Sequence, residues 1–382
     1  MDMKPSRFTE EQIIAILREQ EVGARTADVC RKYGISSETS VSYKSSRLLI
    51  QSNHRRSRYN MQSFVSIFIP CYNAERWIAQ AIESALAQTW LDKEIIVVDD
   101  GSTDRSLDVI RSFHSRIRWE TGPNRGGNSA RNRLLELARA KWVQYLDADD
   151  YLLAEKIGQQ MEFLESHADT DVVFGPVTIE HSFQPDARRE LLAIPECHDL
   201  WTLLASWRLP QTGAPLWRKQ AILDVGGWKV NQPCCQEHEL YLRLLINNKR
   251  FAYCPSNGAV YRQWSNSTVC TQDIAKVHRS CLEIEQWLED YLRQQGQLTS
   301  RRLTAINQTR FRIARIAWQY DPALASQVMD RVRSLEPDFC PKGPAAPARY
   351  WLIYRMFGFE AAERLASLIR KNFRPSVWVL TK

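Results

Sequence analysis

Between residues 64 and 146, short apolar segments alternate with segments of helical spacing. The apolar segments at 65–69, 94–98, 117–119 and 142–146 predict strands, and those at 74–88, 106–113 and 129–140 predict helices. Strands that alternate with helices indicate an α/β layer with a mostly parallel central sheet. Because ligands bind at the C-terminal ends of the strands in such sheets, we expect the functional residues there.

Polar side chains follow three of these strands. The first strand ends in Pro70-Cys-Tyr72-Asn73, the second in Asp99-Asp100 and the fourth in Asp147-Ala-Asp149-Asp150. In an extended segment Asp147 and Asp149 point to the same side, where two carboxylates repel and need a cation. Mg²⁺ and Mn²⁺ take oxygen ligands and bridge to substrate phosphates, so this pair predicts a metal–phosphate site. The alternative is a turn with a helix cap and no metal.

Asp99 and Asp100 are candidates to accept hydrogen bonds from a nucleobase N–H or a ribose hydroxyl. The loop from Asn124 to Asn132 is cationic, and its amides with Arg125 or Arg131 could meet diphosphate oxygens. Solvated surface arginines are the alternative. Neither GxxxxGK[ST] nor GxGxxG follows a strand, which disfavours a P-loop or dinucleotide-binding fold.

These four motifs, in this order and spacing, resemble glycosyltransferase family 2 over about residues 63–265. The resemblance implies a GT-A domain, a nucleotide-diphosphate sugar donor, a Mn²⁺ or Mg²⁺ ion, and inversion at the anomeric carbon. It places Pro70, Tyr72, Asp99 and Asp100 on the nucleoside side, and Asn73 is a further candidate for substrate binding. It also implies that Asp147 contacts the ribose beside the metal and that Asp149 holds the metal.

An inverting transfer needs one general base to take the proton of the attacking hydroxyl. The family has a Glu-Asp pair in a helix near residue 237, and this chain has Gln236-Glu237 instead. Glu237 shares a helical face with Leu240, Tyr241 and Leu244, so it is the expected base. Glu239 is the second candidate, although it is expected in a surface ion pair with Arg243, and His238 is the third.

Residues 176–233 are expected to form the acceptor side. They contain Trp207, Trp217 and Trp228, and Trp217 is the candidate for stacking on a sugar ring. Core packing is the alternative for each tryptophan. Residues 250–254 and 259–262 predict two closing strands.

The N-terminal segment predicts two short helices. Thr9-Glu-Glu-Gln12 is a capping box, and Gly34 ends a second helix. Residues 4–37 resemble the start of a helix-turn-helix protein from insertion-sequence transposons, but residues 38–46 are poor in helix formers where the DNA-reading helix should follow. We interpret residues 1–45 as a fusion remnant and 46–60 as a linker, with a DNA-binding regulator as the alternative.

The net charge of +7 on 382 residues is unevenly distributed. Residues 1–60 hold 11 Lys+Arg and 7 Asp+Glu, residues 61–270 hold 22 and 26, and residues 271–382 hold 18 and 11. The predicted catalytic domain, 61–270, is therefore acidic. Nucleic acid is disfavoured as its partner.

Residues 271–382 predict helices at 274–294, 301–320, 322–335 and 346–372. Arg301, Arg302, Arg310, Arg312 and Arg315 form a basic run, and 346–374 is basic and amphipathic. This pattern fits docking on an anionic membrane, and a helix packed on the catalytic domain with a solvated basic face is the alternative. No segment reaches the roughly 18 apolar residues of a membrane span, and no export signal or CxxC pair occurs, so we expect a cytoplasmic protein.

The sequence thus predicts an inverting, metal-dependent glycosyltransferase acting on a glycan or lipid-linked hydroxyl, in cell-surface polysaccharide synthesis. A nucleotidyltransferase is the nearest alternative enzyme. It should carry a Gly-rich, Lys- or Arg-bearing loop after the first strand, where this chain has Pro-Cys-Tyr-Asn.

Overall fold

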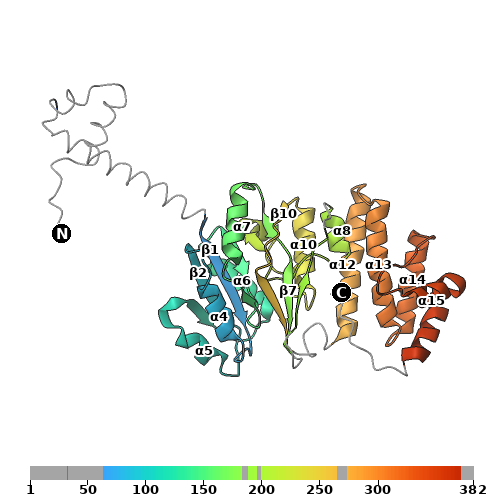
Figure 1. Ribbon diagram of the computed structural model, residues 1–382, viewed down its shortest axis with the longest axis horizontal. Helices are drawn as coiled ribbons and strands as arrows, with labels where there is room; N and C mark the ends of the chain where they lie inside the picture. The colour runs from blue at the N-terminus through green and yellow to red at the C-terminus, as the bar shows by residue number, and fades with distance from the viewer. Residues whose placement is uncertain (1–31, 33–62, 183–187, 196–198, 265–272, 371–382) are drawn as a thin grey trace. The chain divides into compact units, whose positions relative to one another are not determined.

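The computed structural model describes residues 32, 63–182, 188–195, 199–264 and 273–370 (Figure 1). The chain divides into two compact units, Met1–Ser63 and Phe64–Lys382. The helix-turn-helix and linker predictions for residues 1–60 lie outside the described residues, apart from Lys32. All described residues other than Lys32 and Ser63 belong to the second unit.

A seven-stranded sheet forms the centre of this second unit, in the order β10-β6-β9-β4-β1-β2-β3. Its members are β1 (Val65–Cys71), β2 (Lys93–Asp99), β3 (Arg118–Thr121), β4 (Trp142–Tyr145), β6 (Val172–Phe174), β9 (Leu216–Arg218) and β10 (Phe251–Tyr253). β1 pairs in parallel with β2 and β4, and only β9 runs antiparallel to its neighbours β4 and β6. The prediction of an α/β fold with a mostly parallel sheet is confirmed.

Alternating side chains of the strands fill two cores, one on each face of the sheet. Phe68 on β1 and Ile96 on β2 point to the core shared with α6 (Gly127–Leu137) and α10 (Gln236–Ile246). Ile67 on β1 and Ile95 on β2 point to the opposite core, beside α4 (Ile78–Leu86), α5 (Ser106–Ser112) and α7 (Lys156–Glu165). Because both faces are covered, β1 and β2 carry runs of buried apolar residues rather than an alternating pattern.

A second, four-stranded sheet was not predicted. Its order is β5-β11-β7-β8, with β5 (Tyr151–Leu152), β7 (Val177–His181), β8 (Arg188–Leu192) and β11 (Ala259–Gln263). Only β11 was expected as a strand. β11 pairs with β5, which directly follows Asp150, and so the chain returns to the acidic motif from more than a hundred residues away.

Helices make up the described C-terminal region: α12 (Ile274–Gln294), α13 (Ser300–Ala317), α14 (Pro322–Leu335) and α15 (Ala348–Arg370), which lie side by side in Figure 1. The short helices α8 (Leu200–Ala205) and α9 (Lys219–Asp224) complete the unit. α12 packs on α10, and Cys281 and Leu288 belong to the same core as α10. Among the described residues, no helix is both long and apolar enough to cross a bilayer.

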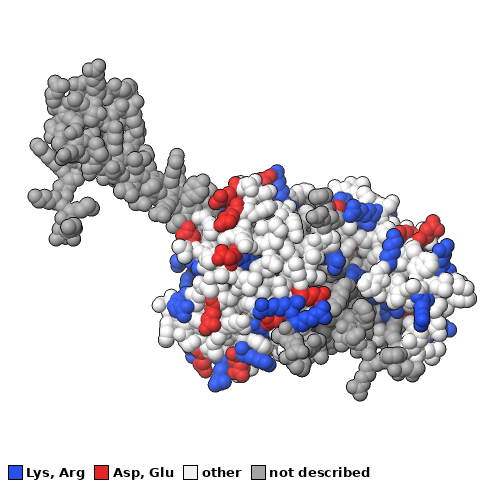
Figure 2. All heavy atoms as spheres, in the orientation of Figure 1, with Lys and Arg blue, Asp and Glu red and all other residues white. Residues whose placement is uncertain are grey.

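The arginines of the basic run are mostly engaged in ion pairs and do not form one continuous basic surface. Arg310 is 2% exposed and pairs with Glu289 at 2.6 Å. Arg302 pairs with Asp199 at 2.9 Å, and Arg315 pairs with Glu363. These pairs join neighbouring helices. Consistent with this, the face seen in Figure 2 shows blue and red side chains interspersed rather than one broad basic field.

Glu285 on α12 is a buried carboxyl in this helical region. Its Oε1 accepts a hydrogen bond of 2.6 Å from the indole of Trp207, and its Oε2 has no partner among the described residues. Burial raises the pKa of Glu285 from 4.5 to about 8. The folded protein therefore binds this proton more tightly than the unfolded chain does.

We predict that Glu285→Gln removes a pH dependence of stability. For a raised pKa, the contribution is complete below about pH 4.5 and is lost as the pH rises through 8. Relative to wild type, the variant should gain about 2–4 kcal/mol in free energy of unfolding between pH 5 and 8.5. Urea unfolding across this range measures the effect. Glu283→Gln, at an exposed position of the same helix, is the control, and parallel pH profiles for wild type and Glu285→Gln would contradict the prediction.

Candidate active site

Three polar strand ends meet at one edge of the central sheet. β4, β1 and β2 are neighbours in the sheet, and the end of β1 is level with the end of β2, where Cys71 is the partner of Asp99. The chain continues from β4 into Asp147, with the Leu146 amide donating to the Phe68 carbonyl of β1 at 2.9 Å. The parallel pairing therefore gathers the first, second and fourth motifs.

The loops after β1 and β2 are joined by side-chain hydrogen bonds. Asn73 Oδ1 accepts from the Thr103 amide at 2.8 Å, and the Asn73 amide donates to Ser102 Oγ at 3.0 Å. The Ala74 amide donates to Ser106 Oγ at 2.8 Å. Asn73 has a positive φ of 49°, a conformation that asparagine tolerates better than most residues. The two loops thus form one rigid wall.

Asp100 shapes the loop that enters α6. Its two carboxylate oxygens accept from the amides of Arg125 and Gly126, each at 2.8 Å. Gly101 has φ +74°, and an added Cβ would lie 2.7 Å from the Asn124 nitrogen. Backbone therefore packs directly on backbone here, and only glycine fits.

The loops after β1 and β2 border a cavity of about 210 Å³. Seven of the predicted site residues line it: Pro70, Tyr72, Asn73, Asp100, Arg131, Asp147 and Asp149. Trp77 of the segment before α4 and Trp264 after β11 complete one side. Tyr72 is 51% exposed, so its ring is available to a planar ligand.

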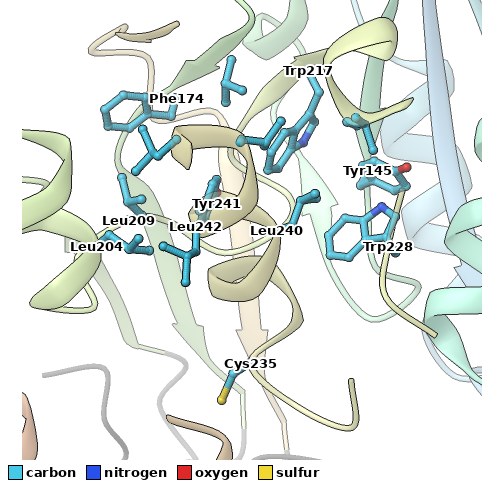
Figure 3. Close-up of a cluster of buried hydrophobic side chains, with 14 of the residues drawn as sticks. Tyr145, Phe174, Leu204, Leu209, Trp217, Trp228, Cys235, Leu240, Tyr241 and Leu242 are labelled. Atoms are coloured by element: carbon cyan, nitrogen blue, oxygen red, sulfur yellow. The ribbon is translucent and has the colours of Figure 1, made fainter. Parts of the chain in front are cut away.

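Five predicted site residues do not line this cavity: Asp99, Arg125, Trp217 and the two glutamates of α10 that are described below. Asp99 is 1% exposed, because its oxygens accept from Thr121 Oγ1 and the Ser102 amide. The Arg125 side chain is exposed outside the lining. Trp217 is fully buried and stacks on Tyr241 at 5.3 Å, with Trp228 nearby, as Figure 3 shows, so it cannot stack on a sugar in this structure.

The acidic motif is held from two directions. Arg131 on α6 donates to Asp147 at 2.8 Å, and its guanidinium lies 4.9 Å from the Trp228 ring centre. From β11, the Arg262 amide donates to Asp150 at 2.8 Å, and Arg262 Nη1 donates to the Asp149 carbonyl at 2.7 Å. Arg131 was predicted as a diphosphate ligand, whereas here its observed partner is a carboxylate.

Trp264 is a site residue that sequence reasoning missed. Its indole Nε1 donates to Asp149 Oδ2 at 2.8 Å, and its ring lies 6.0 Å from that of Trp77. Burial, followed by the charge of Asp147, raises the pKa of Asp149, and burial raises that of Asp150 as well. No sequence signal marks Trp264, because its position depends on the return of β11 to β5.

The two glutamates of α10 have different surroundings. Glu237, in the first turn, accepts from Thr212 Oγ1 at 2.9 Å, and its charge acts on Arg131. Glu239 is 2% exposed and forms a bidentate pair with Arg243, with N–O distances of 2.8 and 2.7 Å. The Glu239–Arg243 pair was predicted, but at the surface, and it is instead buried. Neither glutamate belongs to the cavity lining.

His238 stacks on Trp207 with ring centres 4.0 Å apart. Burial lowers its pKa to about 3, which leaves the imidazole neutral at pH 7.

Thr212 is, after Trp264, the second residue of the site that the sequence did not indicate. It is fully buried and donates its hydroxyl to Glu237.

Comparisons with known proteins agree with this geometry. Residues 66–226 match the family model described as glycosyl transferase family 2, and residues 3–46 match one described as a transposase. The match to glycosyltransferase family 2 thus falls on the region where the four motifs predicted it. The relatives described next align with about a quarter of this chain.

Among these relatives is an uncharacterized glycosyltransferase of Haemophilus influenzae, 38% identical over 27% of this chain and 43% of that protein. Another is the Escherichia coli UDP-Glc:alpha-D-GlcNAc-diphosphoundecaprenol beta-1,3-glucosyltransferase WfaP, 40% identical over 27% of this chain and 41% of that protein. The alignments thus span less than half of each relative.

A solved structure extends the likeness in fold. The crystal structure of Staphylococcus aureus TarS 1–349 has a TM-score of 0.53 over 82% of this chain and 94% of that one. The sequence identity is 15%, so the similarity concerns the fold alone. The GT-A-like architecture is confirmed.

We predict that Asp100→Asn loosens the loop before α6. The asparagine side chain has one carbonyl oxygen, which can accept from only one of the two backbone amides. Its NH₂ group then faces the second amide, and the lost hydrogen bond should lower the free energy of unfolding by about 1–3 kcal/mol. Urea unfolding measures the loss. Asp108→Asn on α5, with a side chain 75% exposed, is the control, and equal effects of the two substitutions would contradict the role of Asp100.

Proposed function

We propose that this chain is an inverting, metal-dependent glycosyltransferase that transfers a sugar from a nucleotide-diphosphate sugar to a hydroxyl acceptor. The observation that carries the proposal is that one cavity is lined both by Pro70, Tyr72 and Asn73 and by Asp147 and Asp149. It offers an aromatic ring for a nucleobase at one end and paired carboxylates at the other. The family match over residues 66–226 supports the same chemistry.

The acidic pair suits a divalent cation. Asp147 and Asp149 are hard oxygen donors close enough for the charge of one to raise the pKa of the other. Arg131 and Trp264 each bind one of these carboxylates, as the second layer around a metal commonly does. When bound, the cation would offset the charge of the diphosphate leaving group. Asp149 and Asp147 are the residues proposed to hold it.

Glu237 is the proposed base. Thr212 donates to one of its oxygens, which orients the carboxylate and keeps that oxygen an acceptor. The other oxygen is the one proposed to accept the proton of the attacking hydroxyl, on the face of the sugar opposite the leaving group. Glu239 is a poorer candidate, because both of its oxygens accept from Arg243.

The acceptor is proposed from the relatives. The Escherichia coli relative is named for glucose transfer to a GlcNAc-diphosphoundecaprenol, and a Pasteurella multocida relative, 40% identical over 25% of this chain and 10% of that protein, is a hyaluronan synthase. We therefore propose a glycan or lipid-linked acceptor in cell-surface polysaccharide synthesis, with the reaction on the cytoplasmic side. The unit from Phe64 onward is proposed to carry all of this chemistry, and residues 1–45 to be a fusion remnant.

We predict that Asp149→Asn abolishes Mn²⁺-dependent binding of the donor, since the variant loses a charged ligand. Trp264→Phe should weaken Mn²⁺ binding roughly tenfold, because the carboxylate loses its orienting donor. Titration calorimetry with Mn²⁺ and a panel of UDP-sugars measures both effects. Asp169→Asn, with a side chain 70% exposed, is the control. Unchanged Mn²⁺ and donor affinity in Asp149→Asn would refute the metal assignment.

We predict that Glu237→Gln retains donor binding while turnover falls about 10²–10⁴-fold, the usual loss on removing a general base. Slow hydrolysis of the donor, with water as the acceptor, provides the assay. Glu239→Gln is the matched control: it breaks the pair with Arg243 and should lower the unfolding temperature while turnover stays within a few-fold. The reverse pattern would identify Glu239 as the base.

A further inference from the structure

The terminal helix α15 is fixed by its inner face. Tyr350, Phe359 and Ala362 are buried in a core shared with α13 and α14. Glu363 on α15 pairs with Arg315 on α13, whose guanidinium lies 3.8 Å from the ring centre of Tyr350. Because these contacts set the rotation of the helix, the side chains on its outer face are determined as well.

The outer face of the first half of α15 is apolar at its centre and basic on both flanks. Leu352 and Met356, one turn apart, are 53% and 63% exposed. Arg349 and Arg355 are exposed on either side of Leu352, at i−3 and i+3. Phe357, directly before the break in the helix at Gly358, is 66% exposed.

The second half repeats this arrangement. At Gly358 the backbone leaves helical geometry, with φ 80° and ψ −178°. Beyond it Leu365, Leu368 and Ile369 are 40%, 62% and 58% exposed. Arg364 is exposed beside Leu368, and Glu360 is the exposed acid of this helix, 3.6 Å from Arg364.

We propose that the outer face of α15 docks on an anionic lipid bilayer. Six large apolar side chains of α15 are exposed to water, whereas an ordinary protein surface exposes such residues singly and scattered. Neither Arg349 nor Arg355 forms an ion pair among the described residues. An amphipathic helix with this composition inserts its apolar face at the headgroup level while its arginines reach anionic headgroups.

The positive charge of the α15 face favours an anionic bilayer as its partner over a second copy of the chain. The face carries three arginines against one glutamate, and a two-fold dimer brings the same face of each copy together. In such a dimer the arginines of one copy would lie close to those of the other and repel them. An anionic surface instead supplies the missing countercharge, worth about fivefold in affinity for each arginine near the headgroups. The α15 face also lies outside the matched family domain, so this inference does not depend on the proposed reaction.

The experiment is co-sedimentation of the full chain with vesicles of phosphatidylcholine, with and without phosphatidylglycerol. The wild type is expected to bind the anionic vesicles, and added NaCl should weaken this binding. Met356→Glu and Leu368→Glu should each reduce binding roughly tenfold or more. The combined Arg349→Gln, Arg355→Gln, Arg364→Gln variant should bind anionic and neutral vesicles about equally.

Leu91→Glu is the matched control, since Leu91 is 86% exposed elsewhere on the unit. It should bind like the wild type, and thermal unfolding should verify that all variants remain folded. The proposal is overturned if the wild type does not bind anionic vesicles, or if the α15 variants bind as tightly as the wild type. It is also overturned if light scattering shows a wild-type dimer that Met356→Glu converts to a monomer, because the face would then belong to a second copy.

Discussion

Three carboxylates within four residues have to be held together at the end of β4, and the arrangement of the site depends on how this is done. Asp147, Asp149 and Asp150 repel one another, and the raised pKa values of Asp149 and Asp150 reflect their burial and this repulsion. Arg131 contacts the first, Trp264 the second, and the Arg262 backbone the third. These partners come from α6 and β11, so the motif is stable only in the complete fold.

This constraint explains the role of the second sheet. β11 pairs with β5 immediately after the acidic motif, which brings Arg262 and Trp264 to it. Arg262 also donates to Gln80 on α4 and lies 4.3 Å from the Trp77 ring centre. The small sheet therefore ties the wall of the cavity formed after β1 to the carboxylates formed after β4. The proposed cation would thus bind beside carboxylates whose negative charge Arg131 already partly neutralises.

The C-terminal helices use charge in a different way. Arg302, Arg310 and Arg315, which looked like one basic surface in the sequence, form ion pairs with Asp199, Glu289 and Glu363. Buried pairs of this kind stabilise little by themselves, but removal of one partner leaves an uncompensated charge. The positive charge that remains exposed on α15 accompanies the largest group of exposed apolar side chains on any helix in the described part of the chain.

Much of the fold could be predicted from the sequence, because it follows from local periodicity. The bounds of α12 and α14 were predicted to the residue, and those of β1 and β2 within two residues. Seven site residues could be found because each directly follows a strand or begins a helix, where the parallel sheet must gather them. β5 to β9 could not be found, since they are short and their pairing is long-range.

The sequence by itself determined which chemical groups stand at the strand ends, because strand and helix periods are properties of neighbouring residues. Only the tertiary structure decided which of these groups face the cavity. Asp99 and Trp217 were removed from it by burial, and Trp264 was added by a contact across 115 residues. Thr212 was likewise joined to Glu237 across 25 residues. Burial and long-range hydrogen bonds depend on how the layers pack, and no local pattern records that packing.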